Sequence, residues 1–320
     1  MSLPSSLKSL RLPVVAAPMF LVSGVELVVE TCKAGIVGTF PALNQRTTEG
    51  FADWVDEIQR RLAEHDAANP TQKAAPFGVN LIVHHSNPRV ADDLKVCVEK
   101  KVPLIITSLG AAKDVVDAVH SYGGLVFHDV TNRYHAKKAV EAGVDGLILV
   151  SGGAGGHAGT FNPFALINDI RPNYDGTILL AGCINTGSDV LAAQAMGADL
   201  AYMGTRFIAT KESQAQDEYK EMVCTVGPED IIHTPAISGI PANFMKTSLL
   251  QNGYNMEQLT ATGDASNLGA ALTVSEEAKA WKTVWSAGHG VSGIKDVPAV
   301  TELVDRLDSE YAAARKRLAL

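Results

Sequence analysis

Eight short apolar runs recur along the chain, and most are separated from the next by a stretch with helical spacing. The runs cover residues 13–17, 35–40, 77–83, 103–108, 124–130, 146–151, 177–182 and 200–205. They are apolar throughout rather than alternating, which is typical of parallel strands covered on both faces. Strand–helix alternation repeated eight times predicts an α/β fold, a (β/α)8 TIM barrel, with a doubly wound sheet as the alternative.

The alternation ends after residue 207. Residues 211–285 contain helix-like stretches such as 213–223 and no clear strand, and this length exceeds an ordinary connection. We therefore expect a TIM-barrel domain formed by residues 1–210 and 286–320. Residues 211–285 are expected to form a small helical insertion on the substrate side of the barrel. A final helix over 297–318, with an apolar face, is expected to dock on the barrel.

Composition excludes several classes of protein. The 320 residues carry a net charge of −8, whereas a nucleic-acid-binding protein would present a basic face. No run approaches about 18 apolar residues, so no membrane span is expected. The first residues are too polar for a signal peptide. The four cysteines form neither a CxxC pair nor a metal-ligand spacing, which predicts reduced thiols, a cytoplasmic location and no metal site.

The carboxyl ends of the barrel strands predict the place of the site, because active sites of this fold lie there. Small residues dominate the segments that follow the predicted strands, which suits a large flat ligand lying close to the backbone. These segments are Pro18-Met19-Phe20, the region of Asn80, Ser108-Leu109-Gly110, His128-Asp129, the loop 151–159, Gly182-Cys183-Ile184 and Met203-Gly204-Thr205.

The loop 151–159, with sequence SGGAGGHAG, follows the sixth predicted strand, and five of its nine residues are glycine. Such a loop presents backbone N–H groups that can hold an anion or a flat ring. It also contains His157, and a histidine side chain can exchange a proton near neutral pH. We interpret the loop as a cofactor loop that carries a catalytic base; the alternative is a glycine-rich turn with a surface histidine.

Two further loops predict a phosphate site. In this fold, phosphate groups commonly bind at the loops after strands 7 and 8. Here these loops are 181–187 and 203–206, and each offers N–H donors beside a helix start. Thr205 adds a hydroxyl group, and Thr186 or Ser188 is placed to cap the next helix. Two such loops in the expected places predict a cofactor that carries a phosphate.

Six motifs carry a resemblance to a known family. They are APM at 17–19, PFGVNL at 76–81, GGAGGHAG at 152–159, AGCI at 181–184, MGTRF at 203–207 and WSAGHGVSGI at 285–294. In this order, over about residues 13–310, the set resembles the nitronate monooxygenase family, formerly called 2-nitropropane dioxygenases. The resemblance implies a TIM barrel with a helical domain and one non-covalently bound FMN.

The resemblance also implies roles for individual residues. The implied FMN contacts are Pro18, Met19, Phe20, Asn80, Gly155, Gly182, Cys183, Ile184, Gly204 and Thr205. Gly156, beside Gly155, and His128, at a predicted strand end, complete the expected cofactor set. The catalytic histidine of the family falls on His157, which would remove the α-proton of a neutral nitroalkane or sit over the substrate. The implied reaction is the oxidation of alkyl nitronates by O2.

Two positions depart from the family pattern. Members commonly have Gly-Gly where this chain has Gly182-Cys183, so the cysteine side chain must point away from the phosphate or alter its loop. Relatives often place a lysine near the position of Asp129. An acid there does not favour a negative charge on reduced flavin.

Three hypotheses about function remain open at this point. The first is an FMN-dependent nitronate monooxygenase. The second is an FMN-dependent NAD(P)H:quinone or enoyl reductase, because the same motifs are similar to those families. The third is a flavin-free barrel, such as a sugar-phosphate isomerase or aldolase, which would need a lysine or a carboxylate pair at the strand ends. Use of NAD(P)H and a homodimer also remain open.

Overall fold

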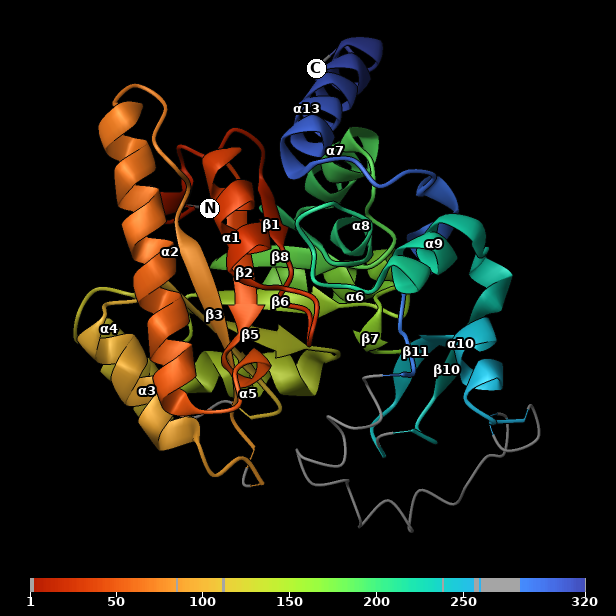
Figure 1. Cartoon of the computed structure of the whole chain (residues 1–320), viewed down its shortest axis with the longest axis horizontal. Coiled ribbons are helices and arrows are strands. Elements are labelled where there is room, and N and C mark those ends of the chain that lie inside the picture. Colours follow the sequence, from red (N-terminus) through yellow and green to blue (C-terminus); the bar gives the residue numbers. More distant parts are fainter. Residues whose placement is uncertain are drawn as a thin grey trace.

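The computed structural model describes residues 3–84, 86–110, 113–237, 239–255, 259 and 283–319. Eight parallel strands close into a barrel in the order β1-β2-β3-β4-β5-β6-β8-β9 (Figure 1). Val15 of β1 pairs with Val37 of β2 and with Tyr202 of β9, which closes the ring. The prediction of a (β/α)8 barrel is confirmed. The strands are β1 (Val14–Ala16), β2 (Val37–Pro41), β3 (Phe77–Ile82), β4 (Leu104–Ser108), β5 (Leu125–Val130), β6 (Gly146–Val150), β8 (Thr177–Ala181) and β9 (Leu200–Met203).

Helices alternate with these strands and cover the outside of the barrel (Figure 1). They are α1 (Val25–Lys33), α2 (Thr48–Ala68), α3 (Val90–Glu99), α4 (Lys113–His120), α5 (Arg133–Ala142), α6 (Pro163–Ile170), α7 (Gly187–Ala195) and the short α8 (Thr205–Ile208). The side chain of Thr186 caps α7, accepting a hydrogen bond from the Asp189 N–H, while the Asp189 carboxylate accepts one from the Thr186 N–H. The last helix, α13 (Val300–Arg317), packs on α7 as expected. Within the described ranges, no helix is long and apolar enough to cross a membrane.

Two apolar layers hold the barrel. Successive residues of a strand point to opposite faces. One set of side chains, including Ile106, Phe127 and Leu179, fills the inside of the barrel and is closed by Leu7 of the 3-10 helix η1 (Ser5–Leu7). The alternate set packs between the strands and the surrounding helices. This alternation decides which strand-end residues face the mouth of the barrel.

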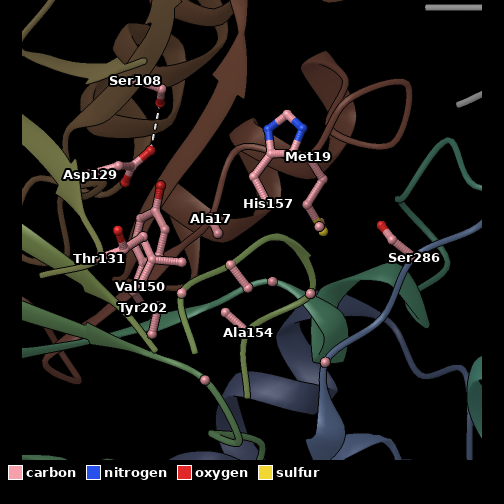
Figure 2. Close-up of a pocket in the computed structure, with 18 of the residues that line it drawn as sticks. Ala17, Met19, Ser108, Asp129, Thr131, Val150, Ala154, His157, Tyr202 and Ser286 are labelled. Atoms are coloured by element: carbon pink, nitrogen blue, oxygen red, sulfur yellow. Dashed lines mark hydrogen bonds between the residues drawn. The ribbon is translucent and has the colours of Figure 1, made fainter. Parts of the chain in front are cut away.

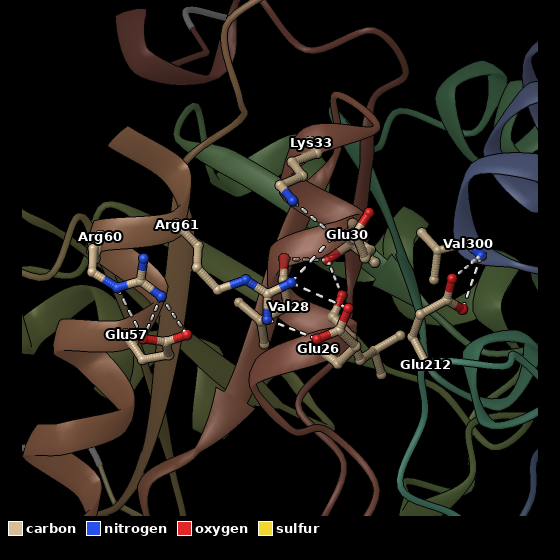
Figure 3. Close-up of polar contacts among 11 residues, drawn as sticks. Glu26, Val28, Glu30, Lys33, Glu57, Arg60, Arg61, Glu212 and Val300 are labelled. Carbon is tan, nitrogen blue, oxygen red and sulfur yellow. Dashed lines mark hydrogen bonds and ion pairs between the residues drawn. The ribbon is translucent and has the colours of Figure 1, made fainter. Parts of the chain in front are cut away.

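Ion pairs join elements on the outside of the barrel (Figure 3). Arg61 of α2 lies 2.7 Å from the Glu26 carboxylate of α1 and 3.5 Å from that of Glu30. The carboxylate of Glu212 accepts a hydrogen bond from the Val300 N–H, which fixes the start of α13 to the segment that follows α8. Exposed pairs of this kind contribute little each, about 0–1 kcal/mol, so the two apolar layers carry most of the stability.

The segment after α8 differs from the prediction. It contains α9 (Asp217–Thr225), the 3-10 helix η4 (Pro228–Asp230), β10 (Ile231–Thr234), β11 (Ala242–Met245) and α10 (Lys246–Gln251). The expectation of helices without a strand was wrong for this part. Strands β10 and β11 are short and pair antiparallel with each other, and β7 (Gly156–His157), far away in sequence, adds a third strand beside β11.

Candidate active site

A pocket of about 910 Å³ opens at the carboxyl ends of the barrel strands. This volume lies in the range of cofactor and ligand sites. Every residue predicted for the site lines this pocket except His128. The predicted residues in the lining are Pro18, Met19, Phe20, Asn80, Gly155, Gly156, His157, Gly182, Cys183, Ile184, Gly204 and Thr205. The structure therefore brings together residues as far apart in the sequence as Pro18 and Thr205.

His128 points to the other side of β5. The alternate residues Phe127 and Asp129 face the inside and the mouth of the barrel, so His128 faces the layer of helices. It is buried, and its Nδ1 atom lies 2.7 Å from the Thr107 hydroxyl group. Burial lowers the pKa of His128 to about 4. His128 is therefore a neutral residue of the outer layer, one position away from the pocket.

The glycine loop between β6 and β7 is fixed by three hydrogen bonds to other elements. The Ser151 hydroxyl group donates to the Ala181 carbonyl at 2.7 Å. The Asn243 amide, buried in β11, donates to the carbonyls of Gly152 at 2.9 Å and Ala154 at 2.6 Å. Since a loop with so much glycine has little conformational preference of its own, these contacts from other elements determine its shape.

His157 lies at the end of this loop, in strand β7. Its backbone pairs with Ala242 of β11, and the Ala158 N–H donates to the Pro241 carbonyl. The side chain is half-buried and faces the pocket; in Figure 2 the Ser108–Asp129 pair and Ser286 lie on opposite sides of it. The segment after the barrel thus positions the histidine by main-chain pairing.

Residues 182–184, after β8, form a bend of the kind that can bind an anion, and we refer to them as the nest. Gly182 and Cys183 both have positive φ, 118° and 59°, and successive N–H groups then point to one side. The N–H groups of Cys183 and Ile184 meet no acceptor in the described part of the chain. A Cβ atom at Gly182 would collide with the Ser151 hydroxyl oxygen. The thiol of Cys183 lies against Gly153 of the neighbouring loop.

A polar cluster occupies the opposite side of the mouth. The Asn80 amide donates to the Ser108 hydroxyl group at 2.7 Å, and the Ser108 hydroxyl group donates to the Asp129 carboxylate at 2.5 Å. The second carboxylate oxygen, Asp129 Oδ1, is buried and has no hydrogen-bond partner. Burial raises the pKa of Asp129 to about 6, although the Ser108 hydrogen bond and His157 act in the opposite direction. Ser108 and Asp129 appeared in the predicted strand ends but not in the predicted site.

The segment 284–290 closes the remaining side. Trp285 stacks on Tyr219 of α9, with ring centroids 5.1 Å apart, and the Tyr219 hydroxyl group donates to the Ser286 carbonyl. The Gly288 N–H donates to the Thr205 hydroxyl oxygen at 3.0 Å. Tyr202, Ser286 and His233 also line the pocket. Sequence analysis missed these three; for Tyr202 the signal was its place on the inner face of the last strand.

Comparisons with known proteins agree with this geometry. The nitronate monooxygenase family model matches residues 2–310. The chain is 27% identical to a nitronate monooxygenase of Paraburkholderia phytofirmans over 96% of this chain and 94% of that protein. It is 28% identical to a (3aS,4S,5R,7aS)-5-hydroxy-7a-methyl-1-oxo-octahydro-1H-indene-4-carboxyl-CoA dehydrogenase of Rhodococcus jostii over 82% of this chain and 71% of that one.

Solved structures show the same fold. FabK from Thermotoga maritima has a TM-score of 0.79 at 24% identity, covering 98% of this chain and 96% of that chain. Nitroalkane oxidase from Streptomyces ansochromogenes also has a TM-score of 0.79 at 24% identity, covering 98% and 100%. The family match spans nearly the whole chain, and the strand-end pocket contains the motifs that first indicated the family. The chain therefore belongs to the nitronate monooxygenase family and is an oxidoreductase that acts on a small molecule.

Proposed function

We propose that the chain is an FMN-dependent nitronate monooxygenase that oxidises alkyl nitronates with O2, and that His157 removes the α-proton of neutral nitroalkanes. The observation that carries this proposal is the arrangement of the pocket. An N–H nest lies after β8, a polar cluster lies on the far side of the mouth, and a histidine from the glycine loop faces the space between them.

The residues present fit FMN. The N–H groups of Cys183 and Ile184 suit a phosphate, since they meet no acceptor in the described chain. The Asp129 oxygen without a partner suits the polar edge of a ring system. Between them the lining consists largely of small residues such as Ala17, Ala154 and Gly204, which leaves room for a flat ring close to the backbone.

The chemistry is divided between cofactor and protein. FMN, when bound, supplies the electron transfer from the substrate to O2. The nest binds and orients the phosphate, and the segment carrying Trp285 and Ser286 excludes water from one side of the pocket. His157 receives the proton on an imidazole nitrogen. Because nitroalkanes are acidic carbon acids, one positioned base is sufficient and no triad is needed.

The variant His157→Ala tests the role of the histidine. We expect the protein to retain FMN and to lose activity on neutral nitroalkanes by about 100-fold or more, the usual contribution of a general base. Activity on preformed nitronates should fall much less, because they need no deprotonation. His120→Ala is the matched control: this exposed histidine on α4 pairs with Asp145 outside the pocket. Equal losses on both substrates would remove His157 from the role of base.

The cofactor is tested by the visible spectrum and by anaerobic mixing with propyl-2-nitronate and, separately, with NADH. The proposal predicts a yellow protein that reacts with the nitronate and not with NADH. Bleaching by NADH would favour an NAD(P)H-dependent reductase instead. A colourless protein that cannot take up FMN would refute both flavin hypotheses.

A further inference from the structure

The polar cluster Asn80–Ser108–Asp129 extends along the mouth from a point directly across the barrel from the nest. In the closed ring β1-β2-β3-β4-β5-β6-β8-β9, strand β3 is four positions from β8, β4 is three positions from it, and β5 is two. Asn80 lies two residues before the end of β3, Ser108 ends β4 and Asp129 is the residue before the end of β5, whereas the nest of residues 182–184 follows β8. A ligand with its phosphate in the nest and its ring across the mouth therefore brings the far edge of the ring to this cluster.

One carboxylate oxygen of Asp129 is the atom of the cluster that lacks a partner. Among the described residues, the buried side-chain polar atoms without a hydrogen bond are Asp93 Oδ2 and Asp129 Oδ1. The other oxygen of Asp93 is held by Arg89 and Thr48 outside the pocket. Asp129, in contrast, lines the pocket. A buried polar atom without a partner is costly, so its position at the pocket wall indicates that a ligand supplies the partner.

We propose that Asp129 is a positioning residue for the ring edge of the flavin, and that its negative charge makes the site bind reduced flavin more weakly than oxidised flavin. This inference rests on the proposed cofactor. The polar edge of a flavin presents a ring N–H between two carbonyl oxygens. A carboxylate accepts a hydrogen bond from that N–H, which orients the ring.

The same carboxylate opposes reduction. Reduced flavin carries its negative charge at the polar edge. A like charge within about 4–6 Å shifts the equilibrium between oxidised and reduced flavin toward the oxidised form by about tenfold or more. The surrounding protein offers little compensation. Strands β3 and β4 contribute the uncharged Asn80 and Ser108, and β6 contributes Val150. Tyr202 from β9 and His157 from β7 interact electrostatically with Asp129, and His135 and Lys138 from α5 line the same pocket.

The experiment compares the midpoint potential of bound FMN in the wild type and in Asp129→Asn, measured with reference dyes from pH 5 to pH 8. Above pH 7 we expect the variant to favour the reduced form about tenfold more than the wild type, a rise of about 30 mV for a two-electron couple. Near pH 5 the two potentials should converge, because the wild-type carboxyl is then protonated. Tyr202 and His157 are present in both proteins, so the difference isolates the carboxyl.

Two further variants sharpen the test. Ser108→Ala removes a hydrogen bond that stabilises the charged carboxylate, so the Asp129 carboxyl should lose its proton at a higher pH in this variant than in the wild type. The midpoint potential of Ser108→Ala should therefore match that of Asp129→Asn up to a higher pH before it falls below it. Asp175→Asn removes an exposed carboxylate outside the pocket, and its midpoint potential should equal that of the wild type at every pH. Equal potentials of wild type and Asp129→Asn at pH 8 would overturn the inference while leaving the proposed function intact. A wild type that binds no flavin would overturn both.

Discussion

Asn243 is expected to hold the catalytic loop in shape, and its removal gives a quantitative test. Its side chain is fully buried in β11 and donates two hydrogen bonds, to the carbonyls of Gly152 and Ala154. Each such bond contributes about 0.5–1.5 kcal/mol net, and a buried carbonyl left without a donor adds about 1 kcal/mol. Asn243→Ala should therefore lower the free energy of unfolding by about 2–4 kcal/mol.

The assay is urea unfolding of the FMN-free protein, together with hydrogen exchange of the Gly156 and His157 amides. In Asn243→Ala the unfolding midpoint should fall and exchange of these amides should become faster, because the glycine loop and β7 both depend on β11. His233→Ala is the matched control. It removes the hydrogen bond from the exposed His233 ring to the Asn243 oxygen but leaves both amide donations in place, so we expect a loss below about 1 kcal/mol. If the two variants differ by less than about 0.5 kcal/mol, the loop is held by other contacts.

Two more predictions concern the nest and the buried histidine. Gly182→Ala should weaken FMN binding and lower the free energy of unfolding more than Gly123→Ala does. Both positions have positive φ, but only at position 182 does the added Cβ atom meet the Ser151 hydroxyl oxygen. Equal losses of stability in the two variants would contradict this collision. The low folded pKa of His128 means that the unfolded state binds the proton first. In the Asp129→Asn background, where the carboxyl group of residue 129 no longer titrates, the free energy of unfolding should fall by up to about 3 kcal/mol as the pH decreases from 6.5 to 4. Adding His128→Gln should make the free energy of unfolding, measured by urea titration, depend less on pH. An unchanged pH dependence would refute the role of His128.

The barrel was predictable because its signal is repeated. Each of the eight apolar runs overlaps a barrel strand; the run 177–182, for example, contains β8 (Thr177–Ala181). The position of the pocket followed from the same pattern, since parallel strands of a barrel end at one mouth. Residues as distant as Asn80 and Gly204 could thus be placed together without knowledge of any contact.

The choice between His128 and Asp129 was not predictable in the same way. Strands covered on both faces are apolar on both faces, so the sequence around β5 contains no alternation that marks the inner side. The inner face was indicated only by the register with neighbouring strands, in which Phe127 pairs with Ile106 of β4. The sheet of β7, β10 and β11 was missed because strands of two and four residues are too short to show a pattern of their own.

The pairing of β7 with β11 has a consequence for the order of folding. The barrel closes through β1 and β9, so all its strands have been synthesised by Met203. The glycine loop needs Asn243, which lies 91 residues beyond Gly152, and the nest side needs Gly290, 105 residues beyond Asn185. Contacts between such distant residues form late, because closing a long loop costs entropy. A chain emerging from the ribosome can therefore complete its scaffold well before its catalytic centre acquires a fixed geometry.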